Sequence, residues 1–279
     1  MKKHFLLFSA VCLFFSGLYQ VAAQTTETPP PNVLLIVREE IKLGKGLDHE
    51  RESNRYTQIL RKAKSPYGRI GMTPIAGNEN EVIYVWGFDS FADLEKWRQM
   101  EERWSTGEFK ADYDKIAQGT EDLHTSQRDM VAVYRPDLSY NPSVNIAEMR
   151  YFRIGTLRVR PGQTSNFLAA ANAYLTALKN AKVDDHIAVY QVISGSADGI
   201  YLLFTPMKSL AEMDTYPARY KPFREALGPE GLKNLDKMFS EVFNPGESSI
   251  YVFNPRMSYV SDQFASRDTA SPGFWNPKN

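Results

Sequence analysis

Apolar positions recur along the chain in two alternating patterns. Short runs that are apolar on both faces predict buried strands, and they lie at 33–43, 69–76, 81–88 and 129–134. Stretches with apolar residues every three or four positions predict amphipathic helices, at about 48–64, 91–103 and 108–123. The resulting order of strand, helix, strand, strand, helix, strand is that of a βαββαβ ferredoxin-like unit.

The second half of the chain repeats this order. Identical residues recur at an offset of about 118 positions: Ile36, Gly44, Tyr56, Leu60, Ala63 and Lys64 return as Ile154, Gly162, Tyr174, Leu178, Ala181 and Lys182. An ordered series of this kind is typical of an internal duplication. We therefore expect a second set of strands and helices between residues 149 and 254.

Turn-forming residues divide the chain into segments. A Pro-rich lead-in at 24–32 precedes the first unit, 33–143, and the Asn-Pro-Ser sequence that ends there separates it from the second unit, 144–260. Residues 261–279 show no period, which predicts a loosely docked C-terminal extension.

The predicted strands are apolar on both faces. In the strand at 81–88, Val82, Tyr84 and Trp86 lie on one face, and Ile83 and Val85 lie on the other. An antiparallel sheet with one solvated face should alternate apolar and polar residues. The second face must therefore be buried. We predict an α+β fold in which two tandem ferredoxin-like units pack sheet to sheet as an intrachain pseudo-dimer, so that the protein acts as a monomer.

The first residues have the pattern of a secretory signal peptide. Two lysines at 2–3 precede an apolar run at 5–18, and small side chains then end at Ala23. This order predicts a cleavable signal over residues 1–23. The run is shorter than the roughly 20 residues that a membrane anchor needs. We therefore expect an exported protein, periplasmic or extracellular, whose mature chain begins at Gln24.

Composition narrows the range of partners. The 279 residues include 33 Lys plus Arg and 33 Asp plus Glu, so the formal net charge is zero and no basic field favours nucleic acid. No other long apolar stretch follows the signal, so we expect no membrane association after cleavage. Cys12 is the only cysteine and falls inside the apolar run. The mature chain then has neither a disulfide nor a cysteine metal ligand.

One segment resembles a known superfamily. Tyr151 to Gly162 reads YFRIGTLRVRPG and precedes a helix that begins near Phe167. It is similar to the first strand and helix of the dimeric α+β barrel superfamily, which includes antibiotic-biosynthesis-monooxygenase-like and NIPSNAP-like domains. The resemblance implies a fold and a pocket between sheet and helices. It does not imply one activity, because members include oxygenases, isomerase-like and haem-handling enzymes and proteins with no known reaction.

The first helix of each unit differs in one stretch. In the second unit the inward positions begin with Phe167, Ala170 and Ala171, whereas the first unit has His49, Glu52 and Ser53 at the same offset. His49, Glu52 and Tyr56 share one helix face. A buried histidine beside a carboxylate predicts a general base, with Tyr56 orienting a substrate oxygen. The alternative is that this end of the helix reaches the rim, where polar residues are solvated.

Other side chains are candidates for ligand contacts. Tyr84 and Trp86 would form the wall of a pocket, and Arg158 would hold a substrate carboxylate unless it forms an ordinary surface ion pair. No two histidines have the spacing of a local metal site, and no phosphate or dinucleotide loop occurs. We expect no metal and no cofactor, and leave open a metal site assembled from distant positions.

These observations support three hypotheses for the function. The leading one is an exported soluble protein that binds a small apolar or aromatic molecule between sheet and helices, mostly in the first unit. The second is a cofactor-free oxygenase- or isomerase-like enzyme that uses His49 as its base. The third is a structural or interaction scaffold, which would have no cavity.

Overall fold

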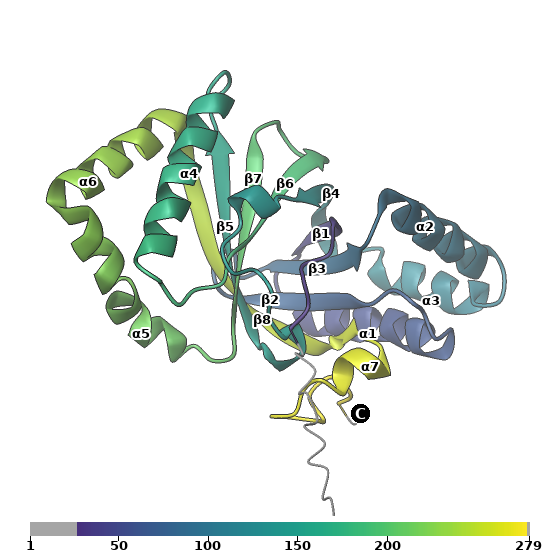
Figure 1. Cartoon of the computed structure of the whole chain (residues 1–279). Helices are drawn as coiled ribbons and strands as arrows, with labels where there is room; N and C mark the ends of the chain where they lie inside the picture. Colours follow the sequence, from purple (N-terminus) through teal and green to yellow (C-terminus); the bar gives the residue numbers. More distant parts are fainter. Residues whose placement is uncertain (1–26, 278–279) are drawn as a thin grey trace, which may run out of the picture.

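The computed structural model describes residues 27–277, so the predicted signal peptide lies outside the described residues. Eight antiparallel strands form a closed barrel in the order β1-β3-β2-β8-β5-β7-β6-β4, and helices lie outside it (Figure 1). The strands are β1 Val33–Ile41, β2 Arg69–Ala76, β3 Glu81–Phe88, β4 His124–Tyr134, β5 Tyr151–Val159, β6 Ala188–Ser194, β7 Ile200–Met207 and β8 Phe243–Tyr259. Within this part of the chain, no helix has the length and apolar content needed to cross a membrane.

The two halves of the barrel meet at two seams. The first four strands lie in the order β4-β1-β3-β2, and the last four lie in the order β8-β5-β7-β6. One seam pairs β2 with β8, as at Met72 and Phe253, and the other pairs β4 with β6, as at Val133 and Gln191. The halves are therefore hydrogen-bonded edge to edge, so the two predicted sheets form one closed barrel. The strands are apolar on both faces because one face of each strand lines the barrel interior and the other is covered by helices.

The helices cover opposite sides of the barrel (Figure 1). On the side of the first four strands lie α1 Gly46–Lys62, which also packs against β8, α2 Phe91–Thr106 and α3 Lys110–Thr120; on the side of the last four lie α4 Thr164–Asn180, α5 Glu212–Arg219 and α6 Lys221–Val242. Ser90 begins α2 by accepting a hydrogen bond from the backbone N–H of Asp93. Gly44 and Gly162 adopt φ of 79° and 78° in the turns before α1 and α4, a conformation that favours glycine.

Three apolar clusters match this arrangement. The barrel interior contains residues from both halves, among them Ile36, Met72, Ile83, Ile154, Leu202 and Phe253. A second cluster, which includes Tyr84, Trp86 and Phe88, lies between the first strands and their helices. A third, which includes Phe167, Leu178 and Tyr201, lies in the matching place in the second half. The space between sheet and helices is thus largely filled by side chains.

The C-terminal segment is packed more tightly than the sequence predicts. Short α7, Asp262–Ala265, leads to Trp275, whose side chain is 2% exposed and whose Nε1 donates to the carbonyl of Ala147 at 2.8 Å. Arg150 and Asp268 form an ion pair at 2.6 Å. The prediction of loose docking is therefore wrong for this segment, because single aromatic anchors leave no periodic pattern in a sequence.

Candidate functional site

His49 lies buried between α1 and the barrel. It is the fourth residue of α1, directly after the turn at Gly44, and is 3% exposed. Its Nε2 lies 2.7 Å from Oε2 of Glu39 on β1 and 3.5 Å from the hydroxyl of Tyr84 on β3. The alternative that this helix end is a solvated rim is therefore wrong. His49 is a buried histidine hydrogen-bonded to a carboxylate.

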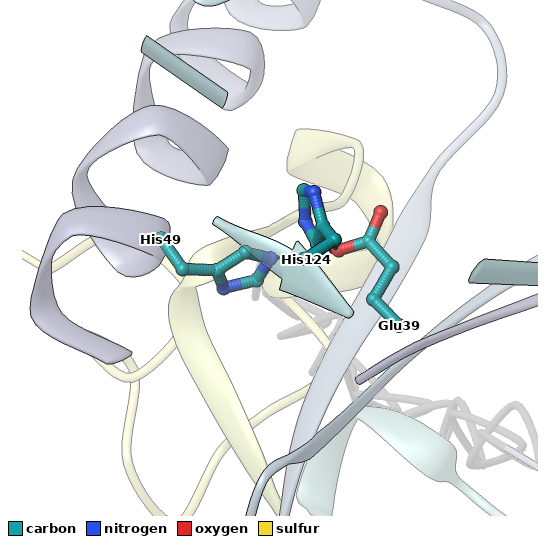
Figure 2. A group of neighbouring side chains, drawn as sticks. All are labelled: Glu39, His49 and His124. Carbon is teal, nitrogen blue, oxygen red and sulfur yellow. Dashed lines mark hydrogen bonds and ion pairs between the residues drawn. The ribbon is translucent and has the colours of Figure 1, made fainter. Parts of the chain in front are cut away.

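A second histidine reaches the same carboxylate. His124, the first residue of β4, pairs with Ile41 of β1 and places Nε2 3.4 Å from Oε2 of Glu39. Its ring meets the His49 ring edge to face, with centroids 5.3 Å apart. The His124 Nε2 is buried and makes no hydrogen bond with good geometry. Figure 2 shows the three side chains, which we call the His–Glu cluster, converging from α1, β1 and β4.

The two histidines keep Glu39 ionised. Burial raises the pKa of this carboxyl, but its close contacts with the imidazoles of His124 and His49 outweigh burial and lower the pKa to about 2. At neutral pH the cluster therefore presents a carboxylate oxygen between two imidazole nitrogens. Such a group can hold a proton or a cation.

Glu52 lies outside this cluster. Its carboxylate accepts hydrogen bonds from Arg55 at 2.8 and 3.0 Å and lies under Gly119 of α3, where a Cβ would be 2.5 Å from the Glu52 carboxyl carbon. The carboxylate beside His49 is Glu39 instead. A catalytic role for Glu52 stays a prediction.

Tyr56 is also directed away from His49. Its hydroxyl donates to Glu101 of α2 at 2.8 Å, and Tyr113 of α3 donates to the same carboxylate at 2.7 Å. Burial raises the pKa of Glu101. The guanidinium of Arg69 lies 4.4 Å from the Tyr56 ring centre and 4.3 Å from that of Tyr84. Tyr56 thus belongs to a buried network beside the His–Glu cluster, and its proposed contact with a substrate stays a prediction.

The three predicted ligand-binding residues are not brought together. Tyr84 and Trp86 are buried on the helix-facing side of β3, in contact with each other and with Arg69. Arg158 lies on β5 in the other half, half exposed, and pairs with Glu247 at 2.9 Å. This is the surface ion pair that the sequence left open as an alternative. Binding roles for these residues stay predictions.

The described part of the chain contains an apolar hollow and a polar one. One has a volume of 390 Å³ at the barrel end near α7, and it is lined mainly by apolar side chains, including Leu34, Ile70, Val85, Phe152, Ala188, Tyr190, Phe204 and Phe264. We call it the barrel-end cavity. The other, of 480 Å³, is polar and lies at the start of α1, lined among others by Asp48 and Leu123. The apolar hollow is therefore not between sheet and helices, where the sequence places it.

Glu39 and His124 are not among the site residues that the sequence predicts. The pattern of the first half places the start of its final strand at residue 129, but β4 begins at His124 and continues the pairing with β1. A signal was present in the repeat offset. It matches Glu39 with Leu157 and His124 with Phe243, so both are polar where the second half is apolar.

Comparison with solved structures finds similar chains at very low sequence identity. A proposed monooxygenase from Fusobacterium nucleatum is 9% identical over 81% of this chain and 94% of its own, with a TM-score of 0.50. One from Lactobacillus acidophilus is 10% identical over 82% and 96%, with a TM-score of 0.49. A chlorite dismutase from Candidatus Nitrospira defluvii is 9% identical over 81% and 92%, with a TM-score of 0.44. No protein-family model and no curated protein matches the sequence.

The strand order defines the fold class. The chain is an α+β protein built on a closed antiparallel barrel of eight strands, and the monooxygenase-like structure from Fusobacterium nucleatum shares this fold. The predicted resemblance to the dimeric α+β barrel superfamily, with its NIPSNAP-like members, stays a prediction. At this identity the likeness concerns the fold, so the function must be argued from the site.

Proposed function

We propose that this protein binds a small apolar or aromatic molecule in the barrel-end cavity. The observation that carries the proposal is the cavity itself: 390 Å³ of mainly apolar lining at the mouth of a barrel. Ligand sites of this kind are typically about 300–1,000 Å³ and apolar, with a few placed polar groups. A scaffold would need no such space, so the cavity favours ligand binding over the scaffold alternative.

Arg267 gives the cavity a polar anchor. It is the one charged side chain among the described residues that line it, and its buried Nε has no hydrogen-bond partner there. A buried guanidinium N–H without a partner costs free energy that an acidic group on the ligand would recover. The proposed ligand is therefore an apolar molecule that carries one anionic group.

Two fluorescent naphthalenes test this proposal. We expect 1-anilinonaphthalene-8-sulfonate, an aromatic anion, and its neutral analogue N-phenyl-1-naphthylamine to bind the folded protein. Ala188→Phe fills the cavity and should abolish binding of both, whereas Ala76→Phe, on an exposed position of β2, should not. Arg267→Met should weaken only the anion. Equal binding to Ala188→Phe and the wild type, with unchanged circular dichroism, would contradict the proposal.

We infer that the chain consists of two tandem ferredoxin-like units that form an intrachain pseudo-dimer. Two features that the halves share support this inference. Strand order is equivalent in the two halves, and Lys64 and Lys182, at the ends of α1 and α4, share the uncommon φ values of 47° and 48°. The tethered second unit then replaces a partner chain, and light scattering should give the mass of one chain.

We propose that the protein is exported, periplasmic or extracellular. The support is the sequence pattern of residues 1–23, which ends in small side chains at Ala23. N-terminal sequencing of protein from its own host should begin at Gln24. A chain with an intact N-terminus recovered from the cytoplasm would contradict this proposal.

A second candidate function is proton transfer by His49, as in a cofactor-free oxygenase- or isomerase-like enzyme. It is favoured by the 2.7 Å contact with Glu39. When Glu39 accepts from Nε2–H, the lone pair of Nδ1 is left to remove a proton from a substrate carbon. Deuterium exchange of an activated aromatic carbon acid such as anthrone, followed by NMR, should be accelerated by the wild type and not by His49→Ala. The same exchange rate in both would remove this candidate.

A further inference from the structure

We propose that Glu39, His49 and His124 bind one divalent transition-metal ion of the first row. This inference goes beyond ligand binding in the barrel-end cavity and does not depend on it, because the two sites lie in different places. It rests on the geometry of the three side chains, on an unpaired buried nitrogen and on a comparison of the two halves of the chain.

The donor atoms are spaced as metal ligands require. One ring nitrogen of His49, one ring nitrogen of His124 and an oxygen of Glu39 all lie within 4.8 Å of one another. Ligand atoms about 2.1 Å from one ion lie roughly 3.0–3.4 Å apart at octahedral or tetrahedral angles. The His124–Glu39 distance of 3.4 Å already fits, and the His49–Glu39 distance of 2.7 Å needs to open by a few tenths of an ångström.

The cluster has an unsatisfied group that an ion would satisfy. The Nε2 of His124 is buried and makes no hydrogen bond of acceptable geometry, although it is directed at the Glu39 carboxylate. Buried polar atoms in folded proteins nearly always have a partner. A cation held between the carboxylate and both imidazoles would give this nitrogen a partner and balance the charge of Glu39.

The second half of the chain shows what fills this place when no polar group is needed. Leu157 is the seventh residue of β5, as Glu39 is of β1; Phe167 is the fourth of α4, as His49 is of α1; and Phe243 begins β8, as His124 begins β4. Phe167 and Phe243 contact each other, with ring centres 5.6 Å apart. Leucine and two phenylalanines therefore form a stable core here. Two histidines and a glutamate in the same positions bury polar groups at a cost in stability.

The surroundings support a site that binds an ion and keeps an open position. The Tyr84 hydroxyl lies 3.5 Å from the His49 Nε2 and is fixed by donating to Ser53 at 2.7 Å. The side chains of His124 and Glu39 are 22% and 15% exposed, so an ion can enter from solvent. Two imidazoles and one carboxylate suit Fe²⁺, Zn²⁺ and their neighbours. With three protein ligands, at least one position stays open to water or substrate.

Metal binding and the His49 base exclude each other. An ion on Nε2 takes the place of the proton that Nε2 shares with Glu39, so the dyad required for proton transfer no longer exists. A metal titration therefore tests this inference directly and also bears on the second candidate function.

The experiment uses the mature chain without a histidine tag, treated with chelator and titrated with Zn²⁺ by calorimetry and with Co²⁺ by visible absorption. We expect one equivalent per chain, with Co²⁺ bands typical of nitrogen and oxygen ligands. Glu39→Gln or His124→Ala should weaken binding by about 100-fold or more, because even residues that only orient a ligand change affinity by 10–100-fold. His186→Gln is the matched control, since His186 lies elsewhere, against Asn141, and it should bind as the wild type does.

A triple variant, Glu39→Leu with His49→Phe and His124→Phe, copies the second half. It should fold, as judged by circular dichroism, and bind no ion. Uptake of one equivalent by this variant with wild-type affinity would place the ion elsewhere and overturn the proposal. Less than half an equivalent on the wild type at micromolar Zn²⁺ would overturn it as well. Should the triple variant fail to fold, the isosteric Glu39→Gln decides the same question.

Discussion

The His49–Glu39 pair predicts a strong coupling that a double-mutant cycle can measure. His49→Phe alone removes the hydrogen bond to an ionised carboxylate that is only 15% exposed. Leaving a buried group without its partner costs about 1–3 kcal/mol, and more when the group is charged. Phenylalanine is the residue that the second half carries at this place, so sequence alone makes the change look harmless. In the single variant, however, the carboxylate of Glu39 loses its partner, so we expect His49→Phe to lower the free energy of unfolding.

The double variant Glu39→Leu/His49→Phe should recover the loss. It makes the pair apolar, as Leu157 and Phe167 are in the second half, and such replacements range from neutral to about 1–4 kcal/mol stabilising. The coupling energy should therefore reach about 2–3 kcal/mol, within the range for residues in contact. Thermal unfolding in chelator resolves this effect, because 1 kcal/mol shifts the Tm of a chain of this size by roughly 2–4 °C.

The cycle has a clear contrary outcome. If the destabilisation of the double variant equals the sum for the two single variants, Glu39 and His49 do not stabilise each other, and the reasoning is refuted.

The hydroxyl of Tyr56 predicts a second effect on stability. Tyr174→Phe in the second half is the matched control for Tyr56→Phe, since only Tyr56 donates to a buried carboxylate. Tyr56→Phe should cost about 1–3 kcal/mol through Glu101, and Tyr174→Phe clearly less.

Three further predictions follow from the same structure. Phe167→Ala should cost about 3–5 kcal/mol in urea unfolding, because the ring is buried between Tyr201 and Phe243; a cost below 1 kcal/mol would contradict its place in the core. Trp275→Ala should cost a similar amount, and a variant as stable as the wild type would restore the loose-docking prediction. In chelator, the lowered pKa of Glu39 stabilises the folded state fully above its usual pKa of 4.5, and this contribution is lost as the pH falls toward about 2; the stability of Glu39→Gln should therefore depend less on pH across that interval.

Much of the fold could be predicted from periodicity, and the reason is physical. Strands 69–76 and 81–88 match β2 and β3 at both ends, because runs that are apolar on both faces are rare outside a core. The way the sheets join could not be predicted. Double apolar faces are expected both for stacked sheets and for a barrel covered by helices, and only the β2–β8 and β4–β6 pairings separate the two.

The candidate site was only partly predictable for a similar reason. His49 was found because a single helix face could be compared with its counterpart in the other half. Glu39 follows Arg38 in a charged run that is typical of a strand end at the surface, and His124 lies in a stretch without apolar alternation. Their meeting depends on the antiparallel pairing of β1 with β4, which brings residues 85 positions apart into contact. No local pattern records such a contact.

The two seams also determine when the barrel can close during synthesis. During synthesis the first half emerges complete, but its outer strands β2 and β4 have unpaired edges until β8 and β6 exist. Exposed edges of this kind invite pairing with other chains. Closure then depends on the last strand to be made, and contacts between such distant segments form slowly. A nascent chain that folds its first half early therefore keeps two unpaired edges exposed to aggregation throughout translation of its second half.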